Sequence, residues 1–137
     1  MSVVLDSSIT LAWFFEDERT AAADAVLGHV VKSGAIVPSL WRLEIANALQ
    51  MAVRRKRIKA AFRDASLADL RALDVATDPE TDRQAWATTL HLAERFRLAL
   101  YDAAYLELAQ RLGLPLATLD QELRAAGGAL GVKLLGG

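Results

Sequence analysis

Short apolar runs that end in a carboxylate are the feature that most restricts the fold of this chain. Val3–Leu5 leads directly into Asp6, and Leu116–Leu119 leads directly into Asp120. Apolar runs this short are typical of strands buried on both faces, as in a parallel sheet. Parallel strands need long crossover connections, usually helices. The pattern therefore predicts strands that alternate with helices.

Helical patterns fill the intervals between the apolar runs. The predicted strands are Val3–Leu5, Ala35–Val37, Val75–Ala76, Leu116–Leu119 and Val132–Leu135, and the predicted helices are Ile9–Phe15, Arg19–Val31, Ser39–Arg57, Ala61–Leu73, Thr81–Arg97 and Tyr101–Leu112. Ser39 is expected to cap the third helix, and Trp86 is expected in the core because it lies on an apolar stripe. Strands alternating with helices predict one α/β domain over residues 1–137, with an open parallel sheet.

Composition limits the classes of function. The chain has 137 residues, of which 53% are hydrophobic and 24% charged, and it has no cysteine. Disulfides, thiolate zinc sites and cysteine nucleophiles are therefore excluded. No basic segment precedes the first apolar run, and no stretch approaches the ~20 apolar residues of a membrane span, so we expect a cytoplasmic protein with no membrane contact. With a net charge of −1, any polyanion must be met by a local basic patch or by a metal ion.

Four acids far apart in the sequence are predicted to meet at one edge of the sheet. Asp6 and Asp120 each follow a predicted strand. Glu44 lies near the start of the helix after the second strand, and Asp102 lies at the start of the helix that leads into the strand before Asp120. The carboxyl ends of parallel strands and the starts of the helices that follow them share one edge. Open α/β sheets bind their ligands at that edge.

Clustered carboxylates repel one another unless a cation or protons neutralise them. All-oxygen ligands suit Mg²⁺ or Mn²⁺ rather than zinc. Such an ion, shared with a substrate phosphate, can activate water and stabilise the leaving oxygen of a phosphodiester. Taken singly, an Asp after a strand is more often a turn or helix-cap residue than a metal ligand, and Asp102 also fits a plain acid at a helix N-terminus. Glu44 is the hardest to explain in that way, because a carboxylate beside an apolar stripe is costly without a partner.

Three segments resemble the motifs of a known family in order and spacing: VVLDSSI, LEIANAL and LYDAAYLELAQRLGLPLATLD. They resemble PIN-domain nucleases, in particular the toxin ribonucleases of VapBC toxin–antitoxin modules. The resemblance implies a Mg²⁺-dependent endoribonuclease, with Mn²⁺ as the other candidate ion. It implies metal-binding catalytic acids at Asp6, Glu44, Asp102 and Asp120, supporting residues at Ser8 and Thr118 that orient the acids, and a cleft-facing Asn47.

The resemblance also implies an architecture and partners. The family sheet has four to five parallel strands with helices on both faces. Family members are usually homodimers, and a VapB-like antitoxin inhibits them by laying a peptide into the active-site groove. The substrate class would be RNA. The chain would then be the toxin of a type II toxin–antitoxin system.

A basic run at the end of the Glu44 helix has two interpretations. Arg54, Arg55 and Arg57 form a solvated last turn that the helix dipole favours, or they contact RNA phosphates beside the cleavage site. Arg57 is about 20 Å from Glu44 at helical rise, so it would contact flanking RNA only.

The aromatic run Trp13-Phe14-Phe15 lies on a short helix that can bury only one face. The remaining ring is expected either in the core or under a partner protein.

Three other functions fit parts of the pattern. A phosphatase with Asp6 as nucleophile would typically have a second Asp two residues later, where this chain has Ser8. A PIN-like module that binds RNA or protein without cutting it would not need four intact acids. Dinucleotide binding would need a G-x-G-x-x-G motif after the first strand, which is absent.

Overall fold

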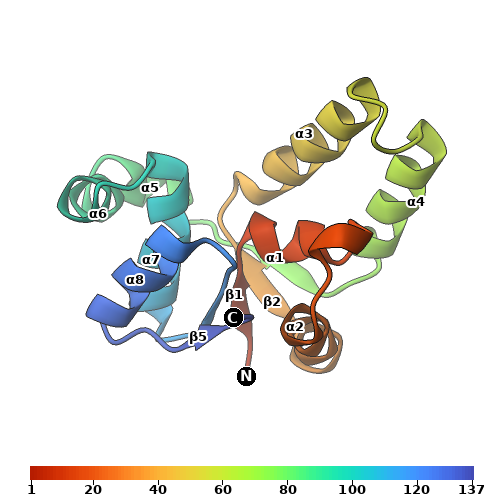
Figure 1. The fold of residues 1–137 in the computed structure, drawn as a ribbon. Helices are drawn as coiled ribbons and strands as arrows, with labels where there is room; N and C mark the ends of the chain where they lie inside the picture. The colour runs from red at the N-terminus through yellow and green to blue at the C-terminus, as the bar shows by residue number, and fades with distance from the viewer.

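The computed structural model describes all 137 residues, which form five strands and eight α-helices with one short 3₁₀ helix (Figure 1). The strands are β1 (Val3–Leu5), β2 (Ala35–Val37), β3 (Val75–Thr77), β4 (Leu116–Ala117) and β5 (Leu134–Leu135). The helices are α1 (Ser7–Ala12), η1 (Glu16–Glu18), α2 (Ala21–Ser33), α3 (Trp41–Arg54), α4 (Ala60–Arg71), α5 (Thr81–Ala85), α6 (Thr88–Phe96), α7 (Leu100–Leu112) and α8 (Gln121–Ala129).

The sheet has the strand order β3-β2-β1-β4-β5, and every pair of neighbours is parallel. The predicted parallel α/β fold is confirmed, with five strands. In the register of the central pair, Leu5 lies opposite Ala117. The next residues along, Asp6 and Thr118, therefore leave the two strands side by side at the carboxyl edge.

Helices cover both faces of the sheet, with α1 to α4 on one side and α5 to α8 on the other (Figure 1). β1 is fully buried, and its side chains join one continuous core with Ile9, Tyr105 and Leu123. At the carboxyl edge, the α3–α4 pair and the α5–α6 pair extend beyond the strands on opposite sides of the molecule. None of the helices combines the length and the apolar character needed to cross a bilayer.

The single helix predicted over Thr81–Arg97 is wrong, and so is the expected burial of Trp86. The chain breaks between α5 and α6, where Ala87 adopts φ −120° and ψ −110°. Because the break rotates one helix relative to the other, the stripe read from the sequence is not one face. Trp86 is 91% exposed, whereas Thr89 and Leu92 face the core.

Two further differences lie at helix ends. Ser39 does not cap α3: its backbone N–H donates to Thr81 Oγ1 at 3.1 Å, and the N-cap position belongs to Leu40. The helix α8 was not expected, because Gly127 and Gly128 weaken its pattern. Asp120 caps α8 by accepting a hydrogen bond from the Leu123 N–H at 2.9 Å.

Candidate active site

The Asp6 carboxylate lies at the end of β1 and is only 3% exposed. Although Asp6 occupies the N-cap position of α1, its side chain makes no capping bond. Its Oδ2 instead accepts hydrogen bonds from the hydroxyls of Ser8 and Thr118, each at 2.7 Å. Both hydroxyls also accept backbone N–H groups, from Leu119 and Asp120 respectively. The two hydroxyls therefore hold Asp6 in one orientation at the β1–β4 edge.

Glu44 lies on α3 and is partly buried. Its Oε1 accepts a hydrogen bond of 2.5 Å from the hydroxyl of Tyr105, a fully buried residue on α7. This bond supplies the partner that the sequence left missing for a carboxylate beside an apolar stripe. The sequence does not single out Tyr105, because its position in the predicted helix Tyr101–Leu112 says nothing about where its hydroxyl points.

Asp102 lies in the first turn of α7, one turn before Tyr105. Unlike Asp6 and Glu44, its carboxylate accepts no hydrogen bond from the protein, so both of its oxygens are open to solvent or to a ligand. Burial and then the negative charges of Asp6 and Asp120 raise the pKa of Asp102 to about 6. The charge of Glu44 contributes to the same rise.

Burial also changes the pKa values of the other two acids, Asp6 and Glu44. Burial raises the pKa of Asp6 above its usual range, against the Ser8 and Thr118 hydroxyls, which lower it. Burial also raises the pKa of Glu44, against the Tyr105 hydroxyl, and the charge of Asp6 adds to the rise. These acids are therefore close enough to disfavour one another's ionisation, which is the situation that a bound cation relieves.

The donor set fits a hard divalent cation that keeps part of its water shell. No three acidic side chains lie close enough together to enclose an ion by direct ligation. Mg²⁺ does not require such a cage, since it commonly binds through one or two carboxylates and retains several waters. The acids that would hold it directly or through water are Asp6, Glu44, Asp102 and Asp120. A bound cation would most stabilise the charged forms of two of these acids: Asp102, whose oxygens are open, and Asp6, which is buried and poorly solvated.

The remaining residues predicted for the site lie farther out. Asn47 is exposed on α3, one turn beyond Glu44. Arg54 and Arg55 are exposed and pair with no acid. Arg57 is already engaged: it donates to Asp17 at 2.6 Å and to Glu18 at 2.9 Å, and its guanidinium lies 4.0 Å from the centroid of the Phe15 ring. Of these three arginines, Arg54 and Arg55 thus remain free to meet a phosphate.

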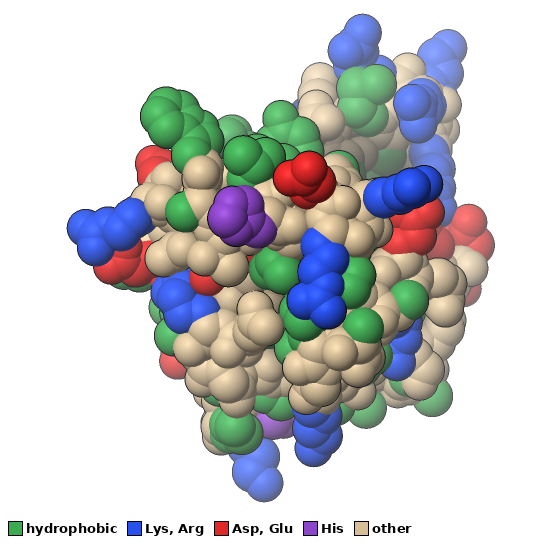
Figure 2. Space-filling view, turned by 90° about the vertical axis from the view of Figure 1, so that its left-hand side faces the viewer, with side chains coloured by type: hydrophobic (Ala, Val, Ile, Leu, Met, Phe, Trp, Pro, Cys, Tyr) green, Lys and Arg blue, Asp and Glu red, His purple; other side chains and the backbone are tan.

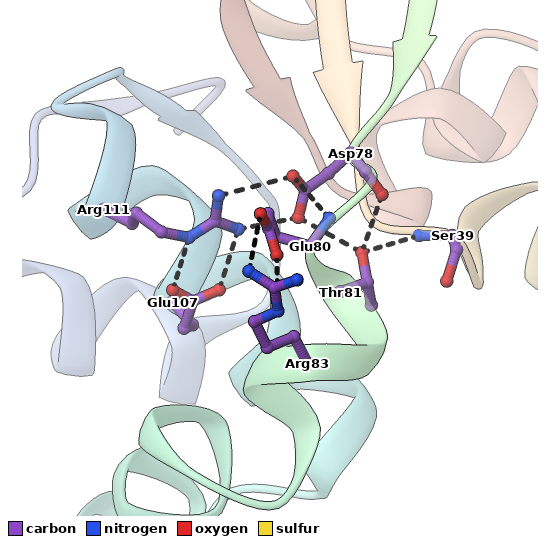
Figure 3. A network of polar contacts seen from close by, with 7 residues as sticks. All are labelled: Ser39, Asp78, Glu80, Thr81, Arg83, Glu107 and Arg111. Atoms are coloured by element: carbon purple, nitrogen blue, oxygen red, sulfur yellow. Dashed lines mark hydrogen bonds and ion pairs between the residues drawn. The ribbon is translucent and has the colours of Figure 1, made fainter.

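A separate ion network joins α7 and the start of α3, two of the elements that carry the acids (Figure 3). Arg111 on α7 donates to Asp78 at 2.6 and 3.3 Å and to Glu107 at 2.8 and 3.1 Å. The two carboxylates are only 3% and 4% exposed. Asp78 also accepts the Thr81 hydroxyl, which in turn accepts the N–H of Ser39 in the turn before α3. The network therefore connects α7, the end of β3, α5 and the start of α3.

Comparison with known proteins gives a consistent family match. The model of the PIN domain family matches residues 3–129. The chain is 30% identical over 127 residues to Ribonuclease VapC3 of Pyrobaculum aerophilum, a match that covers 90% of this chain and 92% of that protein. The crystal structure of PAE2754 from Pyrobaculum aerophilum superimposes with a TM-score of 0.71 at 27% identity, covering 98% of this chain and 83% of that one.

A more distant structure shows the same fold. The Mycobacterium tuberculosis toxin VapC20, described as cleaving the sarcin-ricin loop, superimposes with a TM-score of 0.63 at 18% identity. That match covers 92% of this chain and 95% of the toxin.

Proposed function

The chain belongs to the PIN domain family, and from this premise we propose that it is a Mg²⁺-dependent endoribonuclease that acts as the toxin of a type II toxin–antitoxin pair. Mn²⁺ is the alternative ion. The observation that carries the proposal is that acids from three other elements, Asp6, Asp120 and Glu44, lie near enough for their charges to help raise the pKa of Asp102 to about 6. The name of the VapC3 relative supports RNA as the substrate.

The residues of the chain would divide the work of phosphodiester hydrolysis among them. When bound, Mg²⁺ supplies the charge that polarises the scissile phosphate and lowers the pKa of the attacking water. Ser8 and Thr118 hold the Asp6 carboxylate in place, and Tyr105 does the same for Glu44. Asp102 offers two open oxygens to the ion or to its waters.

Cleavage of a structured RNA with and without the ion tests the proposal. We expect the purified chain to cut RNA in Mg²⁺ and to stop when a chelator removes it, with activity returning when Mg²⁺ or Mn²⁺ is restored. Because the ion stabilises transition-state charge by several kcal/mol, its removal should slow cleavage by about a thousandfold or more. Equal cleavage in chelator would refute the metal mechanism. RNA binding with no cleavage in either ion would favour a catalytically silent module.

A groove beside the aromatic run is the place we assign to the antitoxin. It has a volume of about 1200 Å³ and lies between α1, η1 and the α3–α4 turn. Phe14, Phe15, Val53, Ile58 and Phe62 give it an apolar lining, while Trp13 is buried in the core. Growth tests this role: expression of the chain alone should arrest cells, and co-expression of its cognate antitoxin should restore growth. Normal growth on expression alone would contradict the toxin assignment.

An exposed apolar surface on α5 and α6 supports a homodimer. Trp86 is 91% exposed and Leu90 48% exposed, and hydrophobic side chains gather along the top of this face of the molecule (Figure 2). Exposed apolar patches usually mark contacts with other molecules. Sedimentation equilibrium of the purified chain checks the assignment, and a monomer across the accessible concentration range would rule it out.

A further inference from the structure

Tyr105 is a buried polar residue whose function the acidic motifs leave open. It lies in the second turn of α7, and its side chain is fully buried. Its hydroxyl donates to Glu44 Oε1 on α3, a residue 61 positions away in the sequence. At 2.5 Å this contact falls in the short range of charge-assisted O–H···O⁻ bonds. Burial and then the hydrogen bond to Glu44 raise the pKa of Tyr105, so it remains a donor.

The bond commits one oxygen of Glu44 and leaves the other available. Because Oε1 is held by the Tyr105 hydroxyl, Oε2 points away from Tyr105. Glu44 can therefore bind an ion through Oε2 and keep its hydrogen bond through Oε1. Bidentate ligation would need both oxygens at equal distance from the ion. Turning both oxygens toward the ion would rotate the carboxylate away from the orientation in which Oε1 meets the Tyr105 hydroxyl, and so would weaken that bond.

One-oxygen and two-oxygen ligation suit different ions. Mg²⁺ requires near-octahedral geometry at short distance and is bound through single carboxylate oxygens and waters, whereas Ca²⁺ accepts six to eight ligands and readily takes bidentate carboxylates. We propose that Tyr105 is a positioning residue that restricts Glu44 to one-oxygen ligation and so favours Mg²⁺ over Ca²⁺ at this site. The inference rests on the proposed metal-dependent function.

The chain offers a close control for this proposal. It has only two tyrosines, and the other, Tyr101, lies on the same helix one residue before Asp102. Tyr101 is 63% exposed and makes no hydrogen bond through its hydroxyl. Tyr105→Phe and Tyr101→Phe therefore each remove one hydroxyl from α7 and keep the ring, but only the first breaks the link to Glu44.

The test measures the dissociation constants of Mg²⁺ and Ca²⁺ by calorimetry on the RNA-free protein, with thermal melting to show that each variant is folded. Outer-shell partners of metal ligands typically change affinity by about 10–100-fold, so Tyr105→Phe should shift the Mg²⁺/Ca²⁺ preference toward Ca²⁺ by about tenfold. Tyr101→Phe should leave the ratio within about twofold of the parent, as expected for a surface change. A Tyr105→Phe ratio equal to that of the parent would overturn the proposal.

A second pair of variants tests whether the effect passes through Glu44. In a Glu44→Ala background, Tyr105→Phe should no longer move the Mg²⁺/Ca²⁺ ratio. A shift of the same size in that background would also overturn the proposal, because the hydroxyl would then act on something else. If the parent binds neither ion and cuts no RNA, the proposed function itself fails. If the parent binds and cuts but the ratio does not move, only the assignment of Tyr105 fails.

Discussion

Replacing Asp6 by Asn is expected to abolish RNA cleavage and, at the same time, to raise the melting temperature of the metal-free protein. The amide keeps the shape of the side chain and one oxygen that can accept the Ser8 and Thr118 hydroxyls. It loses the charge that would attract the ion, so cleavage should fall by about a thousandfold. Stability should rise because the fold disfavours a carboxylate that is 3% exposed and whose pKa burial has raised.

The two effects have opposite signs, which separates a functional charge from a structural one. A rise of roughly 3 °C would correspond to about 1 kcal/mol in a domain of this size. Differential scanning calorimetry in chelator and a single-turnover cleavage assay in Mg²⁺ provide the two measurements. Glu122→Gln is the control, because Glu122 is an exposed acid near the same rim and its loss should alter stability by less than about 0.5 kcal/mol. An Asp6→Asn protein that cleaves like the parent would remove Asp6 from the mechanism.

Replacing Arg111 by Met is expected to cost more stability than any other single change in the polar network of Figure 3. Arg111 alone neutralises Asp78 and Glu107, which are buried at 3% and 4% exposure. Removing one partner of a buried ion pair leaves uncompensated charge and typically costs about 3–5 kcal/mol. We therefore expect urea denaturation to show a large fall in the free energy of unfolding.

The same network provides the control. Arg83 pairs with Glu80 at 3.3 Å, but its side chain is 78% exposed. Exposed ion pairs contribute about 0–1 kcal/mol, so Arg83→Met should change the unfolding free energy by less than about 1 kcal/mol. If both variants lower the free energy of unfolding by the same small amount, the buried ion pair does not stabilise the junction of α7, β3 and the start of α3.

The carboxyl-edge acids could be predicted from the sequence, because each is fixed by a local pattern. Asp6 directly follows β1 as predicted, whereas β4 ends at Ala117 rather than Leu119, so Asp120 lies three residues past the strand as the N-cap of α8. Asp102 was placed by the helix that Gly113 ends, with φ +65° at that glycine. The parallel fold followed for the same reason, since short apolar strands separated by helices allow few other arrangements.

The break between α5 and α6 and the side-chain contacts between packed elements could not be predicted from the sequence. The break at Ala87 depends on how α5 and α6 pack, so the stripe that seemed to bury Trp86 was misleading. Contacts such as Arg111 with Asp78 and Tyr105 with Glu44 join residues 33 and 61 positions apart. The periodicity of apolar residues in a sequence does not indicate which residue of another element a hydroxyl or a guanidinium will contact.

The position of Asp6 at the end of β1 and of Asp102 at the start of α7 was therefore determined by the sequence itself, because backbone pattern and turn position are local properties. Their environment was decided only by the tertiary structure. Burial of Asp6, the two hydroxyls on its Oδ2 and the Tyr105 bond to Glu44 all require distant segments to pack together. Desolvation and hydrogen bonding depend on what surrounds a group in space, and these are the forces that turn four separate carboxylates into a candidate site for a cation.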